Sequence, residues 1–260
     1  MRYADLKQFK QSGEKITCLT AYDASLAKLI DRCGVDLILV GDSLGMVVQG
    51  DANTCSVTMS EMVYHTKAVT KVCKRALVVA DLPFQSYEEP LSALENAKLL
   101  INAGAQMVKL EGGAERQEIV EALIKNDIPI CAHLGLQPQK VKEVSDYKIQ
   151  GRDQNSAKRI VEDALLLESL GVSAVVLECV PSSLASLVSE QLSIPTIGIG
   201  AGKDCDGQVL VCFDMLGITQ GKLPRFVRDF TVGNQGVSRA IKAFVEAVKN
   251  QSFPSEEESY

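Results

Sequence analysis

Six short apolar runs divide the chain, and each run ends at a polar or glycine-rich residue. They read LILVGDS (37–43), LVVADLP (77–83), MVKLEGG (107–113), ICAHLG (130–135), AVVLECV (174–180) and TIGIGAG (196–202). Such nearly continuous apolar runs are typical of parallel strands, because helices cover both faces of a parallel sheet. Parallel α/β proteins bind ligands beyond the carboxyl ends of their strands. The pattern therefore predicts functional residues where the runs end.

Segments with helical spacing of apolar residues lie between the runs, at 23–33, 60–73, 90–103, 115–127, 156–170 and 181–192. Strands are expected at 15–21, 35–42, 77–81, 107–111, 129–133, 174–178, 195–198 and 208–212. This alternation indicates parallel βαβ units, and eight strands predict one domain over residues 1–260, a (β/α)8 TIM barrel. An open doubly wound sheet is the alternative, although no GxGxxG motif follows the first strand.

Three longer segments, 49–57, 137–153 and 203–208, interrupt the alternation. Each follows a strand, so we expect all three on the ligand-binding face, where long ordered loops are often functional. A last helix is expected at 237–249. The acidic residues at about 252–260 are expected to form a frayed, solvated tail.

Composition narrows the function classes. The net charge is −6 and no block of basic residues occurs, which disfavours nucleic-acid binding. No apolar stretch approaches the roughly 20 residues that a membrane span needs, and the first residues lack the apolar core of a secretory signal. None of the eight cysteines forms a C-x-x-C pair, so we expect reduced structural thiols and no zinc site. These features predict a cytoplasmic protein.

Three acidic residues end consecutive predicted strands: Asp42, Asp81 and Glu111. Adjacent parallel strands lie about 4.8 Å apart, so three carboxylates at matching heights would converge. Their mutual repulsion would be relieved by a divalent cation, and ligands that are all oxygen favour Mg2+ over zinc. The alternative is that each carboxylate caps a helix or pairs with a lysine. The spacing of three equivalent strand ends favours the metal site.

Other residues at the strand ends complete a candidate site. Lys109 stands two residues before Glu111 and faces the same side of its strand, where it could bind a substrate carboxylate or act as a Schiff-base amine. Glu178 ends the sixth strand among apolar neighbours, which should raise its pKa and suit a general base. His133 is expected to donate a hydrogen bond to an oxyanion, and Ser43 to hold a carboxylate. The other histidine, His65, is expected to pack within a helix.

Motifs along most of the chain resemble one enzyme family. They are TCLTAYDASLA, LVGDSLGMVVQG, VTMSEMVYHTKAV, VVADLPFQSY, NAGAQMVKLEGG, IPICAHLGLQPQ, YKIQGR, VVLECVP, IPTIGIGAGKDCDGQVLV and PRFVRDF. In order and spacing, from about Thr17 to Phe230, they resemble the ketopantoate hydroxymethyltransferase family. The loop at 50–58 (GDANTCSVT) and the segment at 142–146 (KEVSD) depart from the family pattern. Both departures are expected to affect the loops and the folate pocket rather than the chemistry.

The resemblance implies a TIM barrel that assembles as a homo-oligomer, usually a decamer. It implies transfer of a one-carbon unit from 5,10-methylenetetrahydrofolate to 3-methyl-2-oxobutanoate, giving 2-dehydropantoate for the pantothenate pathway. It places the magnesium ligands on Asp42, Asp81 and Glu111, and the ketoacid-binding residues on Ser43 and Lys109 together with Asp42 and Asp81. It places the general base on Glu178.

Other functions remain open from the sequence. A lyase of the isocitrate lyase and phosphoenolpyruvate mutase group would use similar enolate chemistry, but no K-[KR]-C-G-H motif is present. A non-catalytic barrel that binds a small anion is a second alternative, although the strand ends keep their carboxylates. A phosphate-gripping isomerase is a weaker one, since Asp204 and Asp206 follow the glycine run at 198–202 and would repel phosphate.

Overall fold

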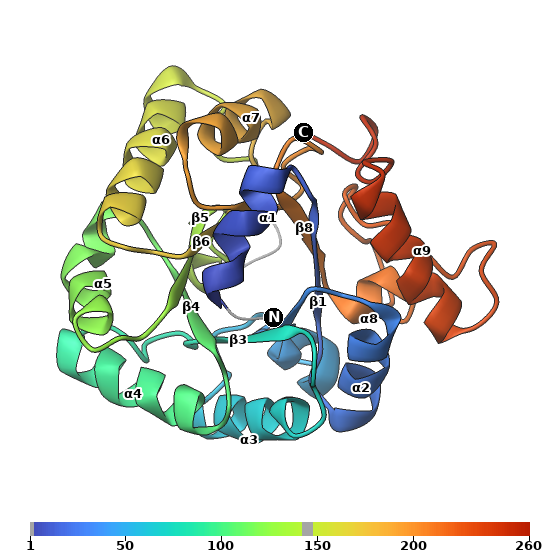
Figure 1. Cartoon of the computed structure of the whole chain (residues 1–260), viewed down its shortest axis with the longest axis horizontal. Coiled ribbons are helices and arrows are strands. Elements are labelled where there is room, and N and C mark those ends of the chain that lie inside the picture. The colour runs from blue at the N-terminus through green and yellow to red at the C-terminus, as the bar shows by residue number, and fades with distance from the viewer. Residues whose placement is uncertain (1–2, 142–147) are drawn as a thin grey trace.

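Eight parallel strands close into a barrel in the computed structural model, which describes residues 3–141 and 148–260 (Figure 1). The strands pair in chain order, and β1 pairs with β8. They are β1 (Ile16–Thr20), β2 (Leu37–Val40), β3 (Leu77–Asp81), β4 (Met107–Glu111), β5 (Ile130–Gly135), β6 (Ala174–Glu178), β7 (Thr196–Ile199) and β8 (Gly207–Leu210). The predicted (β/α)8 TIM barrel is confirmed, and the open sheet is excluded.

Helices surround the barrel, as Figure 1 shows. The α-helices are α1 (Leu6–Ser12), α2 (Ala24–Cys33), α3 (Met59–Thr70), α4 (Pro90–Asn102), α5 (Gln117–Ile124), α6 (Gln154–Ser169), α7 (Ser182–Gln191), α8 (Cys212–Met215) and α9 (Val237–Lys249). Asp23 caps α2 as expected, because its carboxylate accepts from the N–H groups of Ser25 and Leu26. The start expected for α3 at Ser60 is wrong: Thr58 and Glu61 form a reciprocal capping box, and the helix begins at Met59.

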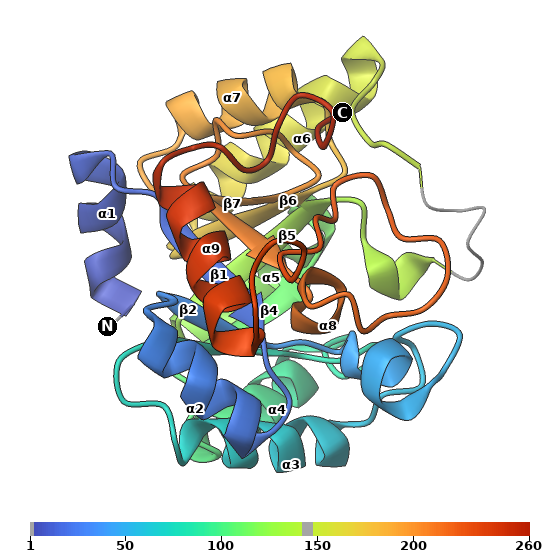
Figure 2. The ribbon, with the colours of Figure 1, turned by 90° about the vertical axis from the view of Figure 1, so that its right-hand side faces the viewer.

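One end of the barrel is closed by α1, which lies at the left in Figure 2, away from most of the loops that follow the strands. Leu6 of α1 is fully buried against the barrel interior, and Phe9 packs beside it. The interior itself is filled by inward-facing apolar side chains, including Leu37, Leu77 and Met107. The N-terminal end is therefore a packed core, and the opposite end is left for a site.

The acidic tail differs from the sequence-based expectation, because residues 252–260 are packed. Phe253 is buried in an aromatic cluster with Phe230 and Phe244. Glu258 pairs with Arg228 at 2.6 Å, and the main-chain oxygen of Tyr260 accepts hydrogen bonds from Ser182. The expected frayed tail is wrong, since one buried aromatic ring and one ion pair hold a segment that looks solvated by composition.

Two of the segments that interrupt the alternation can be located. Residues 49–57 begin at the last residue of η2 (Gly45–Gln49), a π-helical turn that follows β2. Residues 203–206 belong to the connection from β7 to β8, and residues 207–208 lie in β8, so Asp206 lies at the N-terminal end of the barrel. The expectation that this whole segment lies on the ligand-binding face is therefore wrong. The divergent residues at 142–146 lie outside the described part of the chain.

Candidate active site

Five predicted site residues continue the inward-facing rows of their strands. Interior apolar residues at 79, 107, 131 and 176 are followed two positions later by polar ones that face the same way. These are Asp81, Lys109, His133 and Glu178, with Glu111 two residues beyond Lys109. All five are at most 9% exposed, and Glu178 is the most exposed. The barrel interior thus changes from apolar to charged toward the carboxyl ends of the strands.

The strand register brings these side chains together on neighbouring strands. Asp81 of β3 lies beside Lys109 of β4, and Glu111 lies beside His133 of β5. Gly135 pairs with Glu178 at the end of β6. A Cβ at Gly135 would clash with the carbonyl oxygen of Glu178, and the residue has a φ of +90°, so glycine is required for this close approach.

Direct contacts join the acids, the lysine and the histidine. Lys109 Nζ lies 2.9 Å from Asp81 Oδ1, and Asp81 Oδ2 accepts a 3.1 Å hydrogen bond from the main-chain N–H of Asp42. On the other side, His133 Nδ1 lies 3.6 Å from Glu111 Oε1, and His133 Nε2 lies 3.2 Å from Glu178 Oε2. The structure thus forms two groups, Lys109–Asp81–Asp42 and Glu111–His133–Glu178.

The turn after β2 places Asp42 and Ser43. Asp42 is 5% exposed, and Ser43 is half-buried beside it. The Ser43 hydroxyl lies 2.9 Å from the hydroxyl of Tyr22, which holds it at the mouth of the barrel. Both predicted residues therefore reach the same site as the strand residues, although they stand in a turn.

Negative charge exceeds positive charge in this buried site. Four carboxylates (Asp42, Asp81, Glu111 and Glu178) face one lysine. Burial, and then the charge of Asp81, raise the pKa of Asp42 to about 7. Burial also raises the pKa of Glu111 well above its ordinary value, and the charges of Asp42 and Glu178 add to this effect. The two carboxyls resist ionisation because they are buried and lie near other carboxylates, and the charge of Lys109 offsets these effects only in part.

The pKa values of the two basic side chains, Lys109 and His133, shift in opposite directions. Burial alone would lower the pKa of Lys109, but the carboxylates of Asp81, Glu111 and Asp42 outweigh it and raise the pKa. Lys109 is therefore an ammonium ion at neutral pH. Burial lowers the pKa of His133 despite the opposing effect of Glu178. His133 is therefore neutral at pH 7 and has one ring N–H to donate.

The donor chemistry of the site suits a hard divalent cation. All the acidic groups offer oxygen, and Glu111 Oε1 is a buried atom that accepts no hydrogen bond within the described residues. A cation would offset the excess of carboxylates and favour their ionised forms. No group of three or more described His, Cys, Asp or Glu side chains is arranged to hold a metal as it stands. One reason is that Asp81 is already paired with Lys109, so metal binding would require side chains to move.

Sequence reasoning missed three residues of the site: Gln139, Tyr87 and Tyr22. Gln139 Nε2 donates to Asp42 Oδ2 at 2.8 Å. The hydroxyl of Tyr87 donates to Gln139 Oε1 and accepts from the main-chain N–H of Glu111 at 3.3 Å. Gln139 and Tyr87 stand in loops after β5 and β3, outside any periodic pattern. Only their place inside conspicuous motifs could have drawn attention to them.

Several residues prove structural, as expected. His65 is half-buried, and its Nδ1 lies 2.6 Å from the carbonyl oxygen of Tyr22. All eight cysteines are free, and six of them are buried. Within the described residues, no helix is long and apolar enough to cross a membrane.

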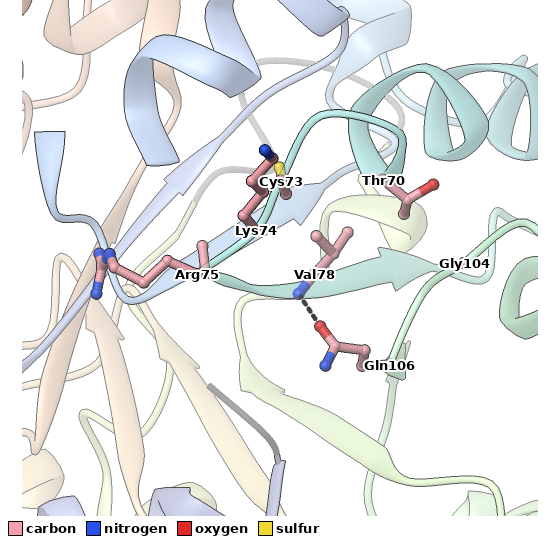
Figure 3. A pocket seen from close by; sticks show the side chains of 8 residues that line it. Thr70, Cys73, Lys74, Arg75, Val78, Gly104 and Gln106 are labelled. Atoms are coloured by element: carbon pink, nitrogen blue, oxygen red, sulfur yellow. Dashed lines mark hydrogen bonds between the residues drawn. The ribbon is translucent and has the colours of Figure 1, made fainter. Parts of the chain in front are cut away.

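Two cavities lie away from the site, toward the N-terminal end of the barrel. One, of about 230 Å3, is lined by residues between α3 and β4, among them Arg75 and Gln106 (Figure 3). There Gln106 Oε1 accepts from the N–H of Val78 at 3.1 Å. The other, of about 410 Å3, lies beside Lys10 and Asp206. Neither is lined by any of the predicted site residues.

Comparison with known proteins places this chain in one family. The family model of ketopantoate hydroxymethyltransferase matches residues 1–256. The 3-methyl-2-oxobutanoate hydroxymethyltransferase of Ruthia magnifica subsp. Calyptogena magnifica is 58% identical over 260 residues, 100% of both chains. That of Nitrosococcus oceani is 52% identical over 256 residues, 98% of this chain and 97% of the relative.

Solved structures show the same fold in more distant proteins. Phosphonopyruvate hydrolase has a TM-score of 0.63 at 15% identity, covering 81% of this chain and 80% of its own. The 2,3-dimethylmalate lyase of the PEP mutase/isocitrate lyase superfamily has a TM-score of 0.59 at 15% identity, covering 83% and 82%. At this identity the likeness concerns the fold alone. The full-length family match decides between the two groups: the chain belongs to the ketopantoate hydroxymethyltransferase family.

Proposed function

We propose that the protein transfers a hydroxymethyl group from 5,10-methylenetetrahydrofolate to 3-methyl-2-oxobutanoate, giving 2-dehydropantoate and tetrahydrofolate. The names of the full-length relatives support the acceptor and the reaction class. The observation that carries the proposal is the joining of Glu178 to the acidic group through His133, in one buried interior that also holds Lys109. This arrangement offers a base and a carboxylate-binding cation to one small ketoacid.

Lys109 is proposed to bind the carboxylate of the ketoacid, with the Ser43 hydroxyl beside it. The raised pKa of Lys109 keeps its amine protonated, and a protonated amine is not a nucleophile. The charge therefore favours carboxylate binding over Schiff-base formation. Tyr22, which holds the Ser43 hydroxyl, would orient that contact.

Glu178 is proposed to remove the proton from C3 of the ketoacid. The C3–H bond breaks, the proton passes to the Glu178 carboxylate, and the electron pair forms the enolate. Water adds to the methylene carbon of the folate, and the two carbon–nitrogen bonds of that carbon break. The two protons of the water pass to the folate nitrogens, so tetrahydrofolate leaves and the one-carbon unit keeps the water oxygen as formaldehyde. C3 then forms a bond to this carbon, and its oxygen takes the proton held by Glu178 to give the hydroxymethyl group.

His133 is neutral and its Nε2 lies 3.2 Å from Glu178 Oε2. Its one ring N–H would orient the Glu178 carboxylate in the resting site or donate a hydrogen bond to a developing oxyanion, but not both at once.

Asp42, Asp81 and Glu111 are proposed to hold Mg2+. When bound, the ion would supply Lewis-acid stabilisation of the enolate charge. The excess of buried carboxylates and the raised pKa values of Asp42 and Glu111 support this role. Homo-oligomer formation, as a decamer, is proposed from the family resemblance, and a cytoplasmic location is proposed from the composition. Sedimentation velocity of the purified protein tests the oligomeric state.

Product analysis tests the proposed function directly. The protein is incubated with 3-methyl-2-oxobutanoate and 5,10-methylenetetrahydrofolate, with Mg2+ or with a chelator, and 2-dehydropantoate is measured by mass spectrometry. We expect product that depends on both substrates and on the metal. Absence of product with metal present overturns the reaction, whereas undiminished product in metal-free protein overturns only the role of Mg2+.

A further inference from the structure

Gln139 is buried to an extent unusual for a loop residue. It stands in η4 (Pro138–Lys140), which follows β5, and only 5% of it is exposed. Its side chain and main chain make hydrogen bonds to three other segments of the barrel mouth. Nε2 donates to Asp42 Oδ2 at 2.8 Å and to the Leu82 carbonyl at 2.9 Å. The main-chain N–H donates to Glu111 Oε2 at 3.1 Å.

The surroundings fix the orientation of the carboxamide. The carbonyl oxygen of Leu82 can only accept, so the nitrogen of the carboxamide must face it. Oε1 then faces the hydroxyl of Tyr87 and accepts a hydrogen bond from it. The same hydroxyl accepts from the N–H of Glu111. Each donor in this network thus faces an acceptor, and a fully paired buried network fixes the positions of its side chains.

Gln139 contacts both groups of the site. It bonds to Asp42, which is connected to Asp81 and Lys109, and to Glu111, which is connected to His133 and Glu178. It occupies one oxygen of each carboxylate. The other oxygen of Glu111, Oε1, accepts no hydrogen bond from any described residue, and Gln139 leaves Asp42 Oδ1 uncontacted.

Resting on the proposed magnesium role, we propose that Gln139 is a positioning residue for the metal ligands. By holding one oxygen of Asp42 and one of Glu111, it would leave the other oxygen of each carboxylate for a bound cation. Hydrogen bonds from outside the ligand set commonly orient metal-binding carboxylates in this way. A leucine or methionine at 139 could fill the space but could not hold Asp42.

Metal binding by the full chain tests this role. Titration calorimetry with Mg2+ gives the dissociation constant for the wild type, for Gln139→Met and for Gln208→Met. Gln208 is the matched control, a glutamine 3% exposed whose Nε2 bonds instead to the Gly202 carbonyl at 2.9 Å. We expect Gln139→Met to raise the dissociation constant roughly 10–100-fold, and Gln208→Met to leave it within about 2-fold.

The outcomes separate the two proposals. A wild-type dissociation constant in folded Gln139→Met, judged by circular dichroism, overturns the role of Gln139 alone. A wild-type protein that takes up no Mg2+ overturns the magnesium role and this inference with it. If Gln139→Met fails to fold, Tyr87→Phe removes only the hydroxyl that orients the carboxamide. That variant should still weaken Mg2+ binding measurably, and unchanged binding there counts against the proposal.

Discussion

The two ends of the barrel both contain acidic side chains, but they satisfy them in opposite ways. At the N-terminal end, Asp31 accepts hydrogen bonds from the main-chain N–H groups of residues 74–76. Asp36 accepts from Thr17 and pairs with Lys249 at 2.9 Å, and Asp206 pairs with Lys10 at 2.7 Å. Each of these acids is therefore held by hydrogen-bond donors or a lysine from its own chain.

Within the described residues at the carboxyl end, Asp42, Asp81, Glu111 and Glu178 share one lysine, and one oxygen of Glu111 has no donor. Hydrogen bonds lower the pKa of Asp31 against the effect of burial, whereas burial raises the pKa of Asp42. Acidic residues thus stabilise the fold at the N-terminal end of the barrel and cost stability at the carboxyl end. An acid that lacks enough donors from its own chain is the better candidate for a ligand site.

The largest expected effect concerns the base at the carboxyl end. Glu178→Gln keeps the shape of the side chain but cannot take a proton, so kcat should fall roughly 10²–10⁴-fold. The KM for the ketoacid should change little, because the glutamine does not remove Lys109. Steady-state kinetics and exchange of the C3 proton for deuterium, followed by NMR, measure both effects. Asp206→Asn at the opposite end is the control and should retain wild-type turnover. Wild-type turnover in Glu178→Gln would disprove the assignment of Glu178 as the base.

Removing a lysine from each end should sharpen the contrast in stability. Lys109→Met leaves buried carboxylates without their cation and should lower the free energy of unfolding by about 3–5 kcal/mol in metal-free buffer. Lys10→Met removes a pair that is more exposed, with 15% and 17% of the two side chains accessible, and should cost about 1 kcal/mol. Urea denaturation measures both. Equal losses would mean that the two ends do not differ as described.

The third expected effect is a difference in the pH dependence of stability, measured in metal-free protein. The pKa of Asp42 is about 7 in the fold against an ordinary value of 3.8. Between these values the folded state binds more protons than the unfolded one, so stability should fall as pH rises, by at most about 1.4 kcal/mol per pH unit. The pKa of Asp31 is lowered, so its contribution is present above pH 3.8 and is lost as pH falls through the folded pKa.

Two variants isolate these slopes. Asp42→Asn should remove the loss of stability between about pH 4 and pH 7, and Asp31→Asn should remove part of the loss in acid. Urea denaturation over pH 3–8 in the presence of a chelator gives both curves. If the two variants change the curve in the same pH range and direction, the contrast between the ends fails.

Sequence periodicity was sufficient to predict the fold and the polar residues that gather where the strands end. The bounds of β3, β4, β6 and α9 agree with the predicted ones. The two-residue spacing also placed Lys109 and Glu111 on one face of β4, and both prove to be buried in the barrel interior. Strand alternation and strand ends are local properties, so they can be read from neighbouring residues.

Contacts between distant loops were decided only by the tertiary structure. Gln139 and Asp42 are 97 residues apart, and no local pattern connects them. Likewise, Phe253 packs against Phe230 and Glu258 pairs with Arg228, and both partners lie in a segment before α9. The sequence by itself determined the barrel and the acids at its strand ends. The closed fold determined which of those acids lack donors, because that depends on the distances between strands and loops that only closure brings together.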